Sequence, residues 1–226
     1  VQNVNTYAFR NPIGLMDNID QVTEHIRAKK PGQLALHFHH TADRKTYVAD
    51  GSNFWRMTNY VPSITYNAVT DLNIVRNAGK AFGEFQMDLH DFDINQLIET
   101  IPGFHNTARR FETFMASVEK DAAGRAASVA DEIQFFTSRK ALMSSIVDRL
   151  GGELPLRVTH NDTKLNNVML DAATREALCV IDLDTVMPGL SAYDFGDSIR
   201  FGAATAAEDE PDASKIQLDL HLFQVY

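Results

Sequence analysis

The residues best suited to chemistry lie in one short polar stretch, HNDTKLNNV, at positions 160–168. Apolar residues precede and follow it, so a loop rich in hydrogen-bonding groups interrupts segments that look buried. His160, Asp162 and Asn167 within it fit the spacing H-x-D-x-x-x-x-N. These residue types at this spacing are typical of a loop that binds a cation or handles a proton.

Phosphoryl transfer accounts for this set of side chains. The reaction needs an oriented hydroxyl, a base that accepts its proton, and cations held near the phosphates. Asp162 would accept the proton, and Asn167 would turn a neutral oxygen toward Mg²⁺. Asp182 follows the apolar run CVI at the end of a predicted strand and would add a charged ligand. Mg²⁺ prefers such hard oxygen ligands.

Two other interpretations compete with this one. The pattern H-x-D with a later N occurs by chance in many loops, so the spacing alone is weak evidence. The string VIDLDTV also resembles the opening of haloacid-dehalogenase-type phosphatases, in which the first aspartate is a nucleophile. That interpretation leaves HNDTKLNN unexplained. Only 44 residues follow Asp182 in the 226-residue chain, too few for the downstream groups that such folds need.

The histidine-rich string HFHH, at positions 37–40, invites a metal-site interpretation. In a strand, alternation would place His37 and His39 on one face and His40 on the other. This is poor geometry for zinc, so we expect ordinary strand histidines.

The composition limits the partners. The chain carries a formal net charge of −9, which argues against nucleic acid because phosphate neutralisation needs a basic face. There is no run of eighteen apolar residues, so we expect no membrane helix. A single cysteine, Cys179, excludes an internal disulfide and fits a reducing, cytoplasmic compartment. The chain lacks an initial methionine and ends in an apolar-patterned segment, so we expect a fragment truncated at both ends.

Hydrophobic spacing predicts the elements that must position the polar loop. Asn11 and Pro12 start a helix that Pro31-Gly32 ends. Alternation then predicts three strands, with a turn at Asp50-Gly51. These strands are expected at about 34–40, 44–49 and 54–61.

From Pro62 onward the spacing becomes helical, with a helix from Leu72 to Leu89. Two more helices are expected at about 107–120 and 128–150, and short strands at about 156–158, 168–170 and 177–181. The tail is expected to be loop and short helix. The sequence therefore predicts an α+β protein, with a sheet-plus-helix lobe at residues 1–62 and a larger, mainly helical lobe at residues 63–226 that carries the catalytic and metal-binding loops. The hinge would lie near residues 57–63.

Longer strings carry a family resemblance. THNDTKLNNVMLD, CVIDLDTVMPGLSAYDFGDSIRFGA and IPGFHNTARRF resemble the phosphotransferase family of aminoglycoside and choline kinases, and most of all its N-acetylhexosamine 1-kinase branch. WRMTNYV and KAFGEFQ extend the resemblance over nearly the whole chain. The resemblance implies a two-lobed, protein-kinase-like fold that uses ATP and Mg²⁺ to phosphorylate a small molecule, here the anomeric hydroxyl of a sugar.

By motif match, the resemblance implies roles for the loop residues. Asp162 would be the catalytic base, and Asn167 and Asp182 would be the Mg²⁺ ligands. Lys164 would steady the transferred phosphoryl group, with a solvated lysine as the alternative. Asp184 would be a hydrogen-bond anchor or a further metal contact.

Two other polar residues are expected to support the loop rather than react. Asp194, in YDFGD, would brace it, and His160 would hold it by hydrogen bonds to the backbone.

The nucleotide site is implied by the segment WRMTNYV, which matches the connector between the lobes. Met57, Asn59 and Tyr60 would lie beside the adenine. Glu24 would pair with a strand cation over the phosphates, with a plain exposed glutamate as the alternative. The family usually offers a lysine or arginine on the strand before this helix, whereas this chain has Asn3, which cannot supply that charge to the phosphates.

A sugar acceptor needs polar partners for its hydroxyls and an apolar face for its ring. Phe201 would form such a wall, and Arg200 and His105 are candidate contacts, although a structural role suits each equally well. Two alternatives stay open. One is a kinase of another small hydroxyl compound, choline- or aminoglycoside-like, and the other is a non-catalytic nucleotide- or sugar-binding relative, which Asn3 suggests.

Overall fold

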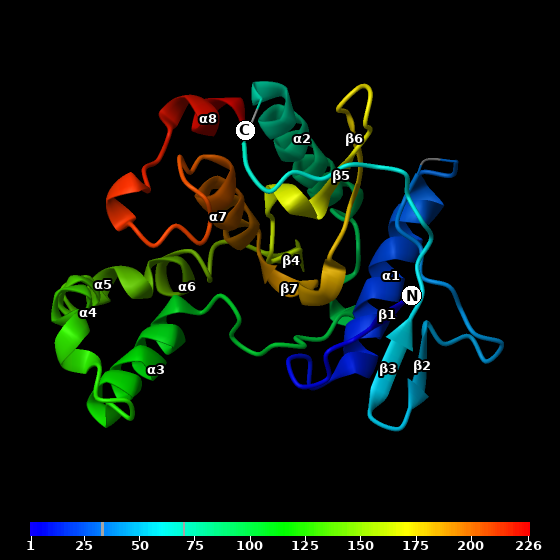
Figure 1. Ribbon diagram of the computed structural model, residues 1–226. Helices are drawn as coiled ribbons and strands as arrows, with labels where there is room; N and C mark the ends of the chain where they lie inside the picture. The colour runs from blue at the N-terminus through cyan, green and yellow to red at the C-terminus, as the bar shows by residue number, and fades with distance from the viewer. Residues whose placement is uncertain (33, 70) are drawn as a thin grey trace. The chain divides into compact units, whose positions relative to one another are not determined.

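The computed structural model describes residues 1–32, 34–69 and 71–226 (Figure 1). The chain forms two compact units. One consists of Val1–Thr100 with Leu156–Tyr226, and the other is Ile101–Pro155. This division does not test the predicted lobe boundary at residue 62, which stays a prediction. No described helix is long and apolar enough to span a membrane.

Helix α1 spans Pro12–Lys29 and starts where the sequence predicts it. Asn11 Oδ1 accepts a hydrogen bond from the Gly14 backbone N–H at 3.0 Å, which satisfies one of the free donors of the first turn. Pro12 occupies the first helical position, where no backbone donor is needed. The predicted first helix is therefore confirmed.

A three-stranded antiparallel sheet lies in the same unit as α1. Its order is β1 (Gln2–Asn3), β3 (Asn53–Arg56) and β2 (Tyr47–Asp50). Gly51 has φ +58° in the turn between β2 and β3, a conformation that glycine adopts without strain. The predicted turn at Asp50-Gly51 is confirmed, although β3 ends sooner than predicted.

The predicted strand at 34–40 is wrong, because only Phe38 forms an isolated bridge, with Thr58. The alternation instead reflects burial, since Leu36 and Phe38 enter the core. The backbone of this segment is satisfied without a ladder. The Asn59 backbone N–H donates to the carbonyl oxygen of His37 at 3.1 Å, and the side chain Oδ1 of Asn59 accepts from the His37 backbone N–H at 2.9 Å.

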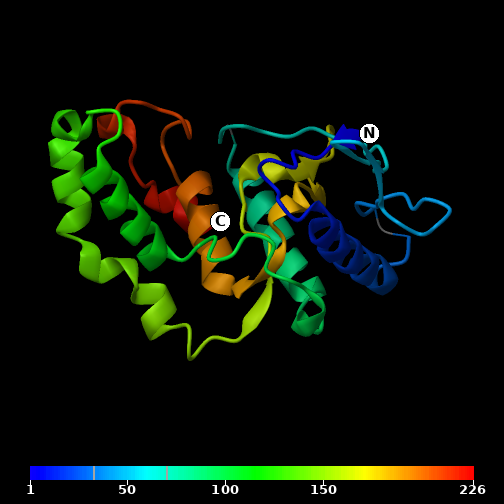
Figure 2. The ribbon, with the colours of Figure 1, turned by 90° about the horizontal axis from the view of Figure 1, so that it is seen from below.

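Two short antiparallel strand pairs and three helices complete the described part of this unit. Helix α2 (Leu72–Asp88) is capped by Asp71 and lies against β6 in both Figure 1 and Figure 2, where α2 is teal and the hairpin is yellow. The strands are β4 (Leu156–Thr159), β5 (Val168–Leu170), β6 (Ala177–Val180) and β7 (Met187–Leu190); β4 pairs with β7, and β5 with β6. The remaining elements are α7 (Ser191–Gly202), α8 (Leu220–Val225) and single 3₁₀ turns at Ile94–Gln96, Leu165–Asn167, Leu183–Thr185 and Ala213–Lys215.

Strand β7 was not predicted, because its sequence MPGL contains two strand-breaking residues. Pro188 lacks a donor, but β7 has a neighbour on one side only, where proline is tolerated. Gly189 allows close approach to β4, since a Cβ there would lie 2.4 Å from Thr159 Oγ1. The missed strand matters because it fixes the turn that precedes it, residues 182–186.

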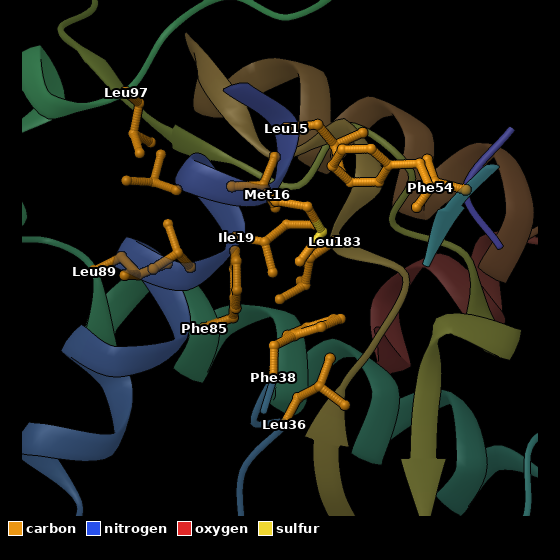
Figure 3. Close-up of a cluster of buried hydrophobic side chains, with 14 residues drawn as sticks. Leu15, Met16, Ile19, Leu36, Phe38, Phe54, Phe85, Leu89, Leu97 and Leu183 are labelled. Carbon is orange, nitrogen blue, oxygen red and sulfur yellow. The ribbon is translucent and has the colours of Figure 1, made fainter. Parts of the chain in front are cut away.

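The larger apolar cluster forms around the buried face of α1 (Figure 3). It joins α1 to β3, α2 and the turn after β6. The residues labelled in the figure are Leu15, Met16, Ile19, Leu36, Phe38, Phe54, Phe85, Leu89, Leu97 and Leu183. Burying a side chain of this size contributes about 1.5–3 kcal/mol, so the cluster holds α1 and the polar turns in register.

The unit Ile101–Pro155 is helical and has a small core, with Phe111 as the single buried apolar residue among its described residues. Helix α3 spans Thr107–Lys120, as predicted. The predicted helix at 128–150 is wrong in its continuity. It is broken into a 3₁₀ turn (Ala126–Val129), α4 (Ala130–Thr137), α5 (Lys140–Met143) and α6 (Ser145–Arg149). At the first break, Ser138 Oγ donates to the Phe135 carbonyl oxygen at 3.0 Å, a local bond that competes with helix propagation.

Candidate active site

The loop after β4 brings two of the predicted site residues into direct contact. Asn167 Nδ2 donates to Asp162 Oδ2 at 3.0 Å and to the Asp162 backbone oxygen at 2.8 Å. The side-chain oxygen of Asn167, Oδ1, therefore points away from Asp162 and accepts no hydrogen bond from any described residue. A buried amide with one free acceptor is suited to a cation.

Asp182 lies beside this pair because the β5–β6 pairing continues past the strands. The Ile181 backbone N–H donates to the Asn167 carbonyl oxygen at 2.9 Å. Asp182 itself has φ +60° and ψ +54°, a left-handed conformation that non-glycine residues adopt only when the surroundings impose it. The side chain reaches solvent. Desolvation, followed by the charges of Asp184 and Asp162, raises the pKa of the Asp182 carboxyl.

The chemistry of these donors fits a hard divalent cation. Asn167 offers a free amide oxygen, and the carboxylates of Asp162 and Asp182 repel one another unless positive charge lies between them. Among the described residues, no three His, Cys, Asp or Glu side chains are grouped to hold a metal. The set found here mixes two carboxylates with one amide, so water and ligand oxygens would complete the shell, as is usual for Mg²⁺.

His160 ties the loop to the strand end that precedes Asp182. Its ring is fully buried, with Nε2 2.8 Å from the Ile181 carbonyl oxygen and Nδ1 3.2 Å from the Asp162 backbone nitrogen. The first contact requires a proton on Nε2, and the second requires a free lone pair on Nδ1. This pattern fits the neutral ring with its proton on Nε2. The buried ring thus fixes the backbone at Asp162 and the backbone just before Asp182.

The buried carboxylate of Asp194, on α7, fixes the backbone of the loop by hydrogen bonds. Oδ2 accepts from the His160 backbone N–H at 2.9 Å, and Oδ1 accepts from the Asn161 backbone N–H at 2.8 Å. Gln86 Nε2 on α2 donates to Oδ2 at 2.6 Å. Burial raises the pKa of the Asp194 carboxyl, and the backbone hydrogen bonds act against that shift. The expected bracing contact is therefore present.

An ion pair that the sequence did not indicate anchors the other side of the turn. Arg56, on β3, makes two contacts with Asp184: Nη1 to Oδ1 at 2.5 Å and Nη2 to Oδ2 at 3.0 Å. The side chains are 8% and 15% exposed. Asp184 is thus a hydrogen-bond anchor in this structure, one of the two roles expected for it. Nothing in the residue pattern singled out Arg56.

Lys164 connects the loop to a neighbouring pocket. Its Nζ lies 3.2 Å from Asp162 Oδ1 and 3.5 Å from Glu208 Oε1. Although desolvation opposes the charge, these carboxylates raise the pKa of Lys164. Arg200 and Phe201 both line the pocket, a hollow of about 520 Å³, as does Glu208. Two of the three predicted acceptor contacts are therefore brought together.

Comparison with known proteins assigns the family. Residues 16–224 match the model of the phosphotransferase enzyme family. The chain belongs to this family.

Solved structures of two phosphotransferases are similar to this family member. An aminoglycoside phosphotransferase from Alicyclobacillus acidocaldarius is 15% identical, with a TM-score of 0.54 over 87% of this chain and 59% of the other. Spectinomycin phosphotransferase APH(9)-Ia, in complex with ADP and spectinomycin, is 16% identical, with a TM-score of 0.51 over 97% of this chain and 63% of the other. The likeness confirms the predicted α+β, kinase-like fold. The chain spans about three fifths of the length of these structures.

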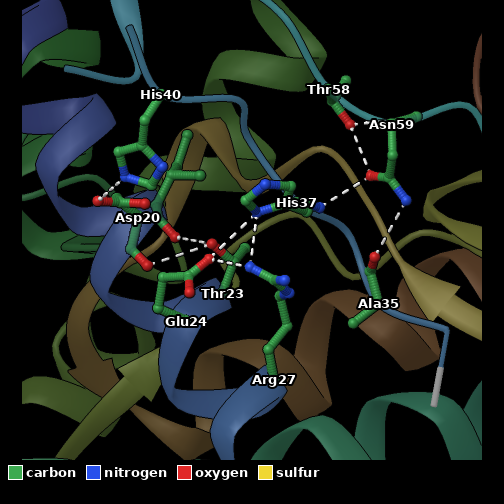
Figure 4. A network of polar contacts seen from close by, with 10 residues as sticks. Asp20, Thr23, Glu24, Arg27, Ala35, His37, His40, Thr58 and Asn59 are labelled. Atoms are coloured by element: carbon green, nitrogen blue, oxygen red, sulfur yellow. Dashed lines mark hydrogen bonds and ion pairs between the residues drawn. The ribbon is translucent and has the colours of Figure 1, made fainter. Parts of the chain in front are cut away.

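In this phosphotransferase-family chain, the three residues predicted to contact adenine differ in the exposure and hydrogen bonding of their side chains. Tyr60 and Met57 are exposed, at 87% and 47%, whereas Asn59 is engaged. Its Nδ2 donates to the Ala35 carbonyl oxygen at 3.2 Å, and its Oδ1 accepts from the His37 backbone (Figure 4). The side-chain amide and the backbone N–H of Asn59 are therefore both engaged within the protein, and the adenine contacts stay predictions.

Glu24 does not contact the loop residues in this structure. Its carboxylate pairs with Arg27 Nη1 at 2.5 Å and His37 Nδ1 at 3.2 Å (Figure 4). These are partners from its own helix and the following segment. His105, the third predicted acceptor contact, belongs to the unit Ile101–Pro155, and its role stays a prediction.

Proposed function

We propose that this chain carries the phosphoryl-transfer centre of an ATP- and Mg²⁺-dependent kinase that acts on a small hydroxyl compound. The observation that carries the proposal is that Asn167 bonds directly to Asp162, while Asp182 is near enough for its charge to interact with that of Asp162. His160 and Asp194 hold the loop in this arrangement. Membership of the phosphotransferase family supports the reaction class.

Each residue has a definite task in this proposal. Asp162 orients the acceptor hydroxyl and takes its proton, and Lys164 places positive charge beside the transferred group. Asn167 Oδ1 and the Asp182 carboxylate hold Mg²⁺, which neutralises charge on the phosphates when bound. Lys164 Nζ pairs with Asp162 Oδ1, so the ammonium group of Lys164 and the proposed base are already next to each other.

The nucleotide would lie along the connector that contains Met57, Asn59 and Tyr60. The exposed side chains of Met57 and Tyr60 support this placement. The ADP in the complex of the similar spectinomycin phosphotransferase supports nucleotide binding as such. Glu24 stays a candidate for the phosphate end of the site, but in that role it would have to exchange Arg27 and His37 for other partners.

For the acceptor we propose a neutral sugar, with the anomeric hydroxyl of an N-acetylhexosamine as the group phosphorylated. The pocket beside Lys164 offers the apolar ring of Phe201 and the polar groups of Asn67 and Arg200. Two carboxylates line it among the described residues. Glu208 is already paired with two cations, and Asp219 Oδ1 accepts hydrogen bonds from the first backbone N–H groups of α8. A cationic acceptor such as choline or an aminoglycoside would need an acidic or aromatic cage. Among the described lining residues Phe201 is the one aromatic side chain, and both carboxylates already have partners, so the lining favours the sugar.

The test is a phosphorylation assay with ATP, Mg²⁺ and a panel of sugars, amino alcohols and aminoglycosides, followed by ³¹P NMR. We expect an anomeric sugar phosphate, and a fall of about 10²–10⁴-fold in kcat on Asp162→Asn. Asp131→Asn, an exposed aspartate on α4, is the matched control and should keep full turnover. Near-normal turnover in Asp162→Asn would refute the base assignment. ATP binding without product for any acceptor would instead favour a non-catalytic relative.

A further inference from the structure

The carboxylate of Glu208 lies where two cationic side chains meet, an arrangement typical of a site for a phosphate group. Its Oε1 lies 3.5 Å from Lys164 Nζ and 3.1 Å from Arg200 Nη2, so one carboxylate oxygen receives two cations. Lys164 is simultaneously bound to Asp162. The two cations therefore converge on a single anionic oxygen next to the predicted catalytic base.

The two ion pairs of Glu208 can readily be replaced by contacts with another anion. The side chains of Lys164, Glu208 and Arg200 are 24%, 41% and 49% exposed, and ion pairs at such exposure contribute little to stability. Arg200 is held independently of Glu208, because its Nε and Nη2 also contact Asp197 Oδ1 at 2.9 and 2.8 Å. Losing Glu208 would therefore leave both cations in place.

The backbone hydrogen bonds that close the segment bearing Glu208 lie at its base. Ala204 forms a bridge with Leu218, and the Thr205 backbone N–H donates to the Gln217 carbonyl oxygen at 3.0 Å. At the tip, the two ion pairs are the contacts of the Glu208 side chain among the described residues. Glu208 also lines the pocket of Phe201, so its departure would widen the passage between that pocket and Asp162.

We propose that Glu208 is an internal competitor for a phosphate-monoester subsite formed by Lys164 and Arg200, and that the phosphate of a bound ligand displaces it. This inference rests on the proposed function for its biological meaning. A phosphate monoester brings about two negative charges and three acceptor oxygens, so it satisfies both cations better than one carboxylate does. The displaced carboxylate turns into solvent, and the subsite closes again when the phosphate leaves.

The experiment measures phosphate affinity without turnover, by calorimetric titration of the whole chain with inorganic phosphate, an N-acetylhexosamine 1-phosphate and ATP. We expect Glu208→Gln to bind inorganic phosphate about tenfold more tightly, because it removes two exposed ion pairs that compete. Arg200→Gln in the Glu208→Gln background should abolish the gain. A larger gain for the sugar phosphate than for ATP would identify the product as the displacing ligand, and the reverse would identify the nucleotide.

Asp209→Asn is the matched control, since Asp209 is an exposed acidic neighbour with no ion pair in the described chain. Equal affinity in Glu208→Gln and the unaltered chain would overturn the proposal, as would an equal gain in Asp209→Asn, which would reflect net charge alone. Because phosphate binding needs no catalysis, a tenfold gain in a chain that phosphorylates no acceptor would support the subsite while rejecting the kinase. Turnover with unchanged phosphate affinity would do the opposite.

Discussion

The ion pair between Arg56 and Asp184 gives the sharpest prediction about what holds the site together. Replacing Arg56 by methionine keeps the apolar stem and removes the guanidinium. The pair is bidentate, with side chains 8% and 15% exposed, so the mutation leaves a largely buried carboxylate without its partner. Removing one member of such a pair costs about 3–5 kcal/mol. We therefore expect a loss of this size in the free energy of unfolding.

The double variant Arg56→Met/Asp184→Leu separates the ion pair from other effects. Replacing both charges by apolar groups is often close to neutral, so the double variant should recover most of the stability. Urea denaturation can be followed by the fluorescence of Trp55, the single tryptophan, which lies on β3 beside Arg56. Because the chain forms two units, a local probe is preferable to a global one.

The matched control is Arg10→Met, an exposed arginine that forms no ion pair in the described chain. It should change the unfolding free energy by less than about 0.5 kcal/mol. A loss below about 1 kcal/mol in Arg56→Met, or single losses that simply add in the double variant, would refute the reasoning, because contacting residues that act as a unit give non-additive effects.

Three further predictions concern residues around the site. Asp194→Asn should leave a backbone donor of His160 or Asn161 unsatisfied and destabilise the protein by about 1–3 kcal/mol, measured by thermal denaturation; an unchanged Tm would contradict the bracing role. Burial raises the pKa of the Cys179 thiol from 9.0 to about 11, so at pH 8 the native thiolate fraction is about a hundredfold below that of an ordinary thiol. Iodoacetamide should react correspondingly slowly and faster as the pH rises toward 11, whereas equal rates in native and urea-unfolded protein would contradict this. Gly189→Ala should place a Cβ 2.4 Å from Thr159 Oγ1 and cost about 1–3 kcal/mol in urea denaturation; no loss would show that β4 and β7 can separate freely.

Much of the site could be predicted because its residues are close in sequence and chemically distinctive. Asp162 and Asn167 lie on one loop, and Asp182 follows an apolar run whose strand character is plain. The structure joins Asp162 to Asn167 by a hydrogen bond and brings Asp182 within reach of the Asp162 charge, although their roles in catalysis stay predictions. Asp194 was identified through its motif, and its hydrogen bonds to the loop match the expectation.

What could not be predicted depends on contacts between distant segments. Arg56 is one arginine among several, and only the β1–β3–β2 sheet places it opposite Asp184. Glu208 lies in a run of acidic residues that is typical of solvated surface, yet its carboxylate forms ion pairs with Lys164 and Arg200. Strand β7 was missed because proline and glycine argue against strands in general, and pairing with a single neighbour removes that objection only once the topology is known.

The prediction of one continuous helix at 128–150 is wrong for a related reason. Its apolar spacing is helical throughout, but Thr137 and Ser138 bond to local carbonyls where α4 ends. Spacing reports which faces are buried, and it does not register such short-range competition.

The central claim is that Asp162, Asn167 and Asp182 surround one divalent cation, and Mn²⁺ binding tests it most directly. Titration followed by electron paramagnetic resonance, with ATP present, should give one site in the unaltered chain. Asp182→Asn and Asn167→Leu should each weaken it by at least about tenfold, while Asp209→Asn leaves it unchanged. Unaltered Mn²⁺ affinity in both site variants would contradict the account.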